Sequence, residues 1–127
     1  MTISFFVEGE PVPCARPRVV GRHAYMPKST VVWQKHVYWT AKQFQPPGLL
    51  IGPLKVSIDF YFKKPKSVKN SIFCIGRGDI DNYVKSILDP LHGVIFKNDN
   101  QVVKLNATKI YGVRIGVEIL VEHIDEQ

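Results

Sequence analysis

The chain has 127 residues and a mass of 14.5 kDa, which corresponds to one domain. Apolar residues make up 45% and charged residues 22%, a globular composition that excludes disordered, collagen-like and coiled-coil chains. No apolar run approaches the roughly 20 residues of a membrane span, and the N-terminus lacks the basic start of a signal peptide. We therefore expect a cytoplasmic protein with no membrane partner.

The net charge is +6, and it is distributed unevenly along the chain. Residues 1–78 carry twelve basic and three acidic side chains, whereas residues 79–127 carry five basic and eight acidic ones. A basic excess on a small domain indicates a polyanionic partner, usually nucleic acid. Charge alone is equally consistent with a solubilising surface.

The N-terminal half predicts a strand, an irregular segment and a helix. Residues 3–7 form a short β-type run. Three prolines within 12–28 indicate a loop or a ragged hairpin. Ser29 or Thr30 then caps a predicted helix that runs to about Phe44, with one apolar face.

The middle of the chain predicts a strand, a basic loop and a second helix. Apolar and polar residues alternate over 54–62, which is the period of a half-buried strand. A basic loop follows as far as Gly78, and a helix with an apolar stripe begins near Asp79. Because Pro90 lacks a backbone N–H, we expect this helix to end or kink near Asp89.

The C-terminal part predicts two strands. A short apolar run at 94–96 precedes a polar turn at 97–100. Strands are expected over 102–111 and 113–122, with a hairpin at Gly112 between them. The order β-α-β-α-β-β predicts an α+β fold in which a mixed sheet of about four strands packs against two main helices.

Carboxylates at the start of the second helix are the first candidates for chemistry. Asp79 and Asp81 open the helix, and Asp81, Lys85 and Asp89 share one face because they are four residues apart. These acids also have a purely structural interpretation, in which Asp79 caps the helix and Lys85 pairs with its acidic neighbours.

Asp99, in the polar turn, adds a third carboxylate. If this turn returns to Asp79 and Asp81, three like charges converge, which is costly unless a cation neutralises them. Oxygen ligands suit a hard ion, Mg²⁺ or Mn²⁺ as its substitute. Such an ion beside a phosphate-binding surface is suited to phosphodiester hydrolysis, and Lys85 would add positive charge at the phosphate.

The run GDIDNYVKSILDPLHGVIFKNDNQVV resembles the signature of the RusA family of Holliday junction resolvases. The residues that match this signature are Asp79, Asp81, Asn82, Lys85, Asp89, Asp99 and Gln101. The segment GEPVPCARPRVV, followed by Tyr25 and Pro27, resembles the start of RusA-like proteins of phages and prophages. The chain departs from the family pattern at Pro90 and at Asn98.

The resemblance implies a RusA-like fold and a homodimeric, Mg²⁺-dependent endonuclease of DNA recombination and repair. Such an enzyme nicks two strands of a four-way DNA junction symmetrically, in the cytoplasm of a bacterial or phage-infected cell. It implies that Asp79, Asp81 and Asp99 hold the metal and that Lys85 is needed for cleavage. Asn82, Asp89 and Gln101 are supporting residues. For Asp89, an ion pair with Lys85 or a hydrogen bond across the subunit is weighed at least equally with metal ligation.

Basic side chains of the N-terminal 78 residues are the candidate DNA contacts, and each is weighed against a solvated surface charge. They are Arg16, Arg18, Lys28, Lys63, Lys64, Lys66, Lys69 and Arg77. Phe73, in the basic loop, is a candidate wedge for an opened junction, although burial in the core is favoured. Two alternative functions remain open: a non-catalytic dimer that binds DNA junctions, and a nuclease that acts mainly on forks or flaps.

Overall fold

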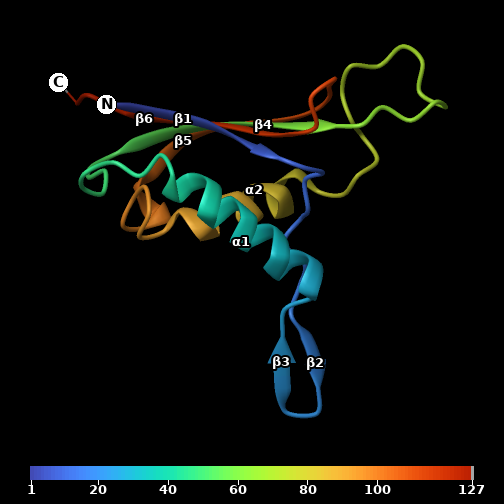
Figure 1. The fold of residues 1–127 in the computed structure, drawn as a ribbon, viewed down its shortest axis with the longest axis horizontal. Coiled ribbons are helices and arrows are strands. Elements are labelled where there is room, and N and C mark those ends of the chain that lie inside the picture. Colours follow the sequence, from blue (N-terminus) through green and yellow to red (C-terminus); the bar gives the residue numbers. More distant parts are fainter. Residues whose placement is uncertain (127) are drawn as a thin grey trace.

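The computed structural model describes residues 1–126, and two helices lie against one face of a four-stranded sheet (Figure 1). The elements are β1 (Thr2–Glu8), β2 (Arg18–Val20), β3 (His23–Tyr25), α1 (Lys28–Lys42), β4 (Leu54–Phe62), α2 (Ile80–Leu91), the 3₁₀ turn η1 (Asp99–Gln101), β5 (Val102–Tyr111) and β6 (Gly116–His123). This arrangement confirms the predicted α+β class. Neither α1 nor α2 combines the length and apolar character needed to cross a membrane.

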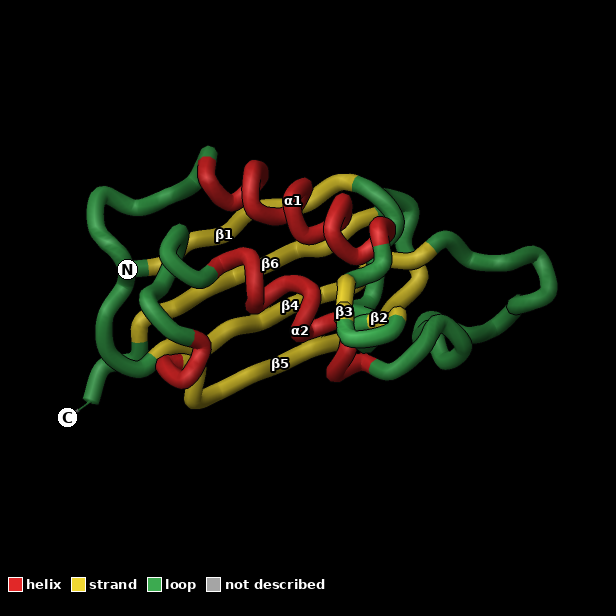
Figure 2. Tube along the Cα trace, turned by 90° about the horizontal axis from the view of Figure 1, so that it is seen from below, coloured by secondary structure: helices red, strands yellow, loops and turns green. Residues whose placement is uncertain are grey.

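The sheet has the strand order β1-β6-β4-β5, which Figure 2 shows from the helix side. β6 is antiparallel to both β1 and β4, whereas β5 is parallel to β4. The alternating pattern of β4 turns its apolar side chains toward the helices, and residues 54, 56, 58, 60 and 62 are at most 1% exposed. The predicted strand over 54–62 is therefore confirmed to the residue.

The predicted hairpin at Gly112 is wrong, because β5 and β6 are not neighbours in the sheet. The chain leaves β5 at Tyr111 and passes over the end of β4 before it enters β6. Gly112 permits this crossing, since a Cβ there would lie 2.7 Å from the ring of Tyr61 on β4. The backbone N–H of Gly112 also donates to the carbonyl of Phe62, the last residue of β4, at 3.1 Å.

The start of α1 also differs from the prediction of a cap at Ser29 or Thr30. The helix already begins at Lys28, and it has no side-chain cap. Thr30 is 1% exposed and instead fastens the preceding segment to the helix. Its Oγ1 donates to the carbonyl of Pro13 at 3.3 Å and accepts from the backbone N–H of Ala15 at 3.4 Å.

The second helix ends two residues beyond Asp89, near which Pro90 was expected to end or kink it. α2 runs to Leu91 with Pro90 inside its last turn. A proline there removes one backbone hydrogen bond, to the carbonyl of Ser86, and no following turn of helix remains to be displaced. Gly93, with a φ of +75°, then turns the chain away.

The segment predicted as a loop or ragged hairpin contains the β2–β3 hairpin. Its strands form a separate two-stranded sheet that projects from the body of the molecule (Figure 1). The main core lies between the four-stranded sheet and the two helices.

Candidate active site

Asp79 occupies the N-cap position of α2, yet its side chain makes no capping hydrogen bond. Asp79 and Asp81 are both exposed, and neither forms an ion pair within residues 1–126. The structural interpretation of Asp79 as a helix cap is therefore not supported. Two carboxylates at this end of the helix are free to bind a ligand.

Two side chains form hydrogen bonds to the backbone that leads into Asp79. The hydroxyl of Tyr83 donates to the carbonyl of Arg77, and Nζ of Lys109 donates to the carbonyl of Gly78. Burial raises the pKa of Tyr83 above its usual value of 10, so the phenol remains a donor at neutral pH. The contacts fix the position of Asp79 relative to the sheet.

The face of α2 that points away from the sheet carries the charged residues expected there. Tyr83, Val84, Ile87 and Leu91 are buried, and Lys85 points away from them. Nζ of Lys85 lies 3.5 Å from Oδ2 of Asp89, which confirms that these two residues share a face. Its side chain is 61% exposed, so a phosphate can still approach it.

Asp99 lies in η1, and Gln101 holds this turn in place. Oε1 of Gln101 accepts from the backbone N–H groups of Lys97 and Asn98, both at 3.0 Å. Its Nε2 donates to the carbonyls of Leu50 at 2.9 Å and Gly52 at 3.1 Å. Gln101 therefore positions the turn that carries Asp99.

A histidine that the sequence did not single out lies beside Asp99. Asp89, His92 and Asp99 each offer a ligand atom, and these atoms lie within 4.8 Å of one another. Residues 1–126 contain no second group of three or more such residues. The sequence offered one signal for His92, its position three residues after Asp89, which places both at the end of α2.

The three carboxylates expected at one metal do not meet in a single chain. Asp79 and Asp81 are at the start of α2, whereas Asp99 lies beside His92 at its end. Eight residues of helix separate Asp81 from Asp89, or about 12 Å of axis. Two oxygen ligands of one Mg²⁺ are at most about 4.2 Å apart, since each bond is about 2.1 Å.

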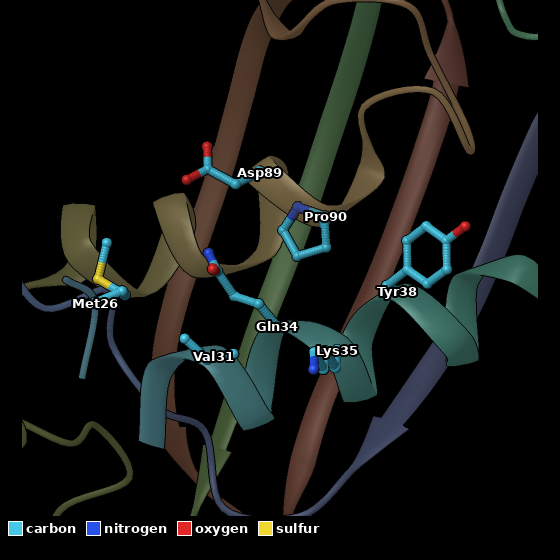
Figure 3. Close-up of a pocket in the computed structure, with 7 residues that line it drawn as sticks. All are labelled: Met26, Val31, Gln34, Lys35, Tyr38, Asp89 and Pro90. Atoms are coloured by element: carbon cyan, nitrogen blue, oxygen red, sulfur yellow. The ribbon is translucent and has the colours of Figure 1, made fainter. Parts of the chain in front are cut away.

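A groove of about 390 Å³ opens beside Asp89, between α1 and the end of α2. Figure 3 shows the side chain of Gln34 extending from α1 toward α2 across this groove. The Nε2 of Gln34 is buried and has no hydrogen-bond partner. Tyr38 and Met26 make the lining largely apolar. The groove therefore offers few metal ligands, and the exposed acids are the candidates for catalysis.

The donor atoms at both ends of α2 fit a hard divalent ion. Carboxylate oxygens are the preferred ligands of Mg²⁺ and Mn²⁺, and an imidazole nitrogen is tolerated by Mn²⁺. Neither cysteine belongs to the group of Asp89, His92 and Asp99, and both Cys14, beside α2, and Cys74 are buried. Burial raises the pKa of the Cys14 thiol, which keeps it protonated.

All eight candidate DNA contacts are exposed. Arg77 pairs with Glu10 at 3.5 Å, and Nζ of Lys64 donates to the carbonyl of Lys69 at 3.0 Å. The side chains of the other candidates, Arg16, Arg18, Lys28, Lys63, Lys66 and Lys69, form no ion pair among the described residues. Phe73, for which burial was favoured, is 56% exposed.

Comparison with known proteins agrees with the resemblance in the sequence. The family described as "Endodeoxyribonuclease RusA" matches residues 8–122. A relative from Bacillus subtilis (strain 168), named "Uncharacterized protein YqaN", is 33% identical over 137 residues. The match covers 96% of each chain.

Proposed function

The chain belongs to the RusA endodeoxyribonuclease family, and on that premise we propose that it resolves four-way DNA junctions by paired, symmetric nicks in a Mg²⁺-dependent reaction during recombination and repair. Family membership makes the protein a crossover junction endonuclease. We also propose, from the geometry of the site, that the enzyme uses Mg²⁺, that it is a dimer and that its two cuts are symmetric.

The observation that carries the proposal is the unpaired carboxylates of Asp79 and Asp81 at the start of α2. Cationic side chains occur near this end of the helix: Nζ of Lys109 donates to the carbonyl of Gly78, Arg77 precedes Asp79 by two residues, and Lys85 follows Asp81 by one turn. Cations beside exposed acids attract a phosphate and a divalent ion to the same place. An acidic surface without these cations would repel DNA.

We assign the metal to Asp79, Asp81 and Asp99, with Asn82 and Gln101 as supporting residues. When bound, a divalent ion supplies an activated water and neutralises charge on the scissile phosphate. Lys85 presents its ammonium to the phosphate from the exposed face of α2. Asp89 keeps Lys85 in place through their ion pair.

The length of α2 supports a homodimer in which each metal site is shared. Asp99 groups with Asp89 and His92 and not with Asp79 or Asp81, and about 12 Å of helix separates Asp81 from Asp89, so we infer that one ion contacts Asp81 of one chain and Asp99 of its partner. A site would then combine Asp79 and Asp81 with the partner's Asp99. Twofold symmetry creates two equal sites, as two symmetric nicks require.

The proposal is tested with a synthetic four-way junction, end-labelled on each strand in turn. With Mg²⁺, we expect paired nicks in opposite strands that a ligase can reseal, and no nicks with a chelator. Asp81→Asn should abolish the nicks but leave junction binding intact. Asp125→Asn is the matched control, because Asp125 is an exposed carboxylate near the C-terminus and should leave nicking unchanged.

Intact junction at every Mg²⁺ and Mn²⁺ concentration would overturn the proposal. Forks and flaps of the same sequence are included as substrates. Faster cleavage of those structures than of the four-way junction would contradict the assignment of the junction as the main substrate, while leaving a branched-DNA nuclease.

A further inference from the structure

The β2–β3 hairpin stands away from the body of the protein, and its two strands pair only with each other (Figure 1). All six strand residues are exposed, including Val19 at 70% and Val20 at 63%. An isolated two-stranded hairpin is marginally stable in water. Both of its faces are therefore available to a partner.

Positive charge on the hairpin that no acidic residue neutralises indicates the chemical class of this partner. Arg16 leads into the hairpin, Arg18 begins its first strand, and Arg22 lies in its turn. No carboxylate occurs between Glu10 and Asp59, and none of the three arginines forms an ion pair within residues 1–126. This favours a phosphate backbone and disfavours a second copy of the hairpin, which would bring like charges together.

The turn at the tip of the hairpin has no side chain at its first position, Gly21. Gly21 has a φ of +62°, which suits the first position of a two-residue hairpin turn. A Cβ placed on Gly21 would meet nothing within 4 Å. Arg22 follows at the second position, so its guanidinium is carried at the outermost point of the arm.

The root of the hairpin is fixed beside the candidate active site. The backbone N–H of Cys14 donates to the carbonyl of Asn82 at 2.8 Å, one residue beyond Asp81. The backbone N–H of Ala15 is held by Thr30 at 3.4 Å. The arm therefore starts at the Asp79 end of α2 and projects from a rigid base.

From Ala15 to Gly21 an extended chain reaches about 20 Å, compared with a major groove about 12 Å wide that admits a two-stranded ribbon. We propose that the β2–β3 hairpin is a DNA-grasping arm, which enters the groove of the duplex next to the cut and places Arg18 and Arg22 on its phosphates. The inference rests on the proposed function only in taking branched DNA as the substrate.

The first test measures how salt weakens binding of the full-length protein to a four-way junction and to plain duplex, in chelator. Each lost phosphate contact lowers the salt slope by about 0.9. The double variant Arg18→Gln with Arg22→Gln should therefore lower the slope by nearly two units and weaken binding at least tenfold. Lys42→Gln with Lys55→Gln removes the same charge far from the arm and should change the slope much less.

The second test locates the arm on the DNA. An iron–EDTA reagent is attached to the thiol of an Ala24→Cys variant, since Cys14 and Cys74 are 6% and 5% exposed and escape labelling. Tethered cleavage should break the duplex that flanks the branch point. Absence of these breaks, or an unchanged salt slope in the double variant, would overturn the proposal.

Sedimentation of the double variant distinguishes the competing occupant. A change of oligomeric state with an unchanged salt slope would mean that the arm holds a second copy, and would also overturn the proposal. Both tests run without Mg²⁺. A wild-type protein that never nicks with Mg²⁺ would therefore contradict the proposed function. It would not affect the conclusion about DNA binding by the arm.

Discussion

Nε2 of His92 lies 3.5 Å from Oδ2 of Asp99, so an imidazole holds the carboxylate that we assign to the metal. The ring of His92 is itself held by an edge contact with Phe96, with centroids 5.6 Å apart. Phe96 is fully buried. The orientation of an exposed catalytic acid is thus linked to the core through one aromatic contact.

Replacing His92 tests this link. His92→Ala should lower the nicking rate at limiting Mg²⁺ by about 10- to 100-fold, because groups that orient a metal ligand have effects of that size. The rate is measured as a function of Mg²⁺, and we expect the half-saturating concentration to rise. His36→Ala is the control, since the ring of His36 on α1 contacts the backbone carbonyl of Glu8 and not the residues around Asp99. An unchanged Mg²⁺ dependence in His92→Ala would show that His92 does not position Asp99.

Gln101 is expected to matter for stability as well as for activity. Gln101→Leu leaves two backbone N–H groups and two carbonyls without their partner, and each lost hydrogen bond contributes about 1 kcal/mol. We expect a loss of about 2–3 kcal/mol in the free energy of unfolding, measured with urea, which is less than four full bonds because three of the four are exposed and their backbone groups regain water. Gln43→Leu, at an exposed position after α1, should change it by less than about 0.5 kcal/mol. Equal stability of the two variants would contradict the role of Gln101.

Local sequence patterns predicted much of the fold. The alternation over 54–62 has one physical interpretation, a strand with one buried face, and β4 has those bounds. The apolar stripe of the second helix was equally clear, because Tyr83, Val84 and Ile87 pack on the sheet. The resemblance to RusA was also correct, since a motif of several charged residues is more specific than any periodicity.

Features that depend on the assembled sheet could not be predicted in this way. Gly112 resembles a hairpin residue, but its role is to let the chain pass over Tyr61, and that role depends on the strand order. The meeting of His92 with Asp99 depends on how the run 94–96 packs beneath α2. The separation of Asp81 from Asp99 follows from the same packing, so spacing alone suggested a convergence that one chain does not provide.

Tyr83 predicts a pH dependence of stability. Burial raises its pKa above 10, so the folded state favours the neutral phenol. Its contribution is complete below pH 10 and is lost as the pH rises through the raised value. Tyr83→Phe loses the hydrogen bond to Arg77 and should cost about 1 kcal/mol at pH 8, measured by urea unfolding. This difference from wild type should shrink by pH 11, while an exposed control, Tyr25→Phe, should show no difference at either pH.

Phe73 is expected to act on branched DNA. Its ring is 56% exposed in the basic loop, beside Ile72 at 67% and Ile75 at 87%, so it is available to stack on an unpaired base. Stacking contributes about 1–3 kcal/mol per base, so Phe73→Ala should slow junction nicking about tenfold. Binding to plain duplex, measured in chelator, should not change. The control is Phe44→Ala, because Phe44 has similar exposure but stacks on Phe5. Equal loss of duplex and junction binding in Phe73→Ala would contradict a wedge.

Mixing inactive chains tests whether the two protomers share each metal site. If one site combines Asp81 with the partner's Asp99, a heterodimer of Asp81→Asn and Asp99→Asn chains places both substitutions in one site and leaves the other intact. Random mixing makes about half of the dimers heterodimers, so about a quarter of the wild-type sites should be active. We expect nicking to reappear as single nicks, because the second site of each dimer is inactive.

The control mixture combines Asp79→Asn with Asp81→Asn chains, which affect the same end of α2. Every shared site then contains one substitution, so this mixture should remain inactive. If the Asp81→Asn and Asp99→Asn mixture also remains inactive, while sedimentation of differently tagged chains shows that heterodimers have formed, the metal site lies within a single chain. The start of α2 would then have to approach Asp99 when DNA binds, which the 12 Å or so of intervening helix opposes.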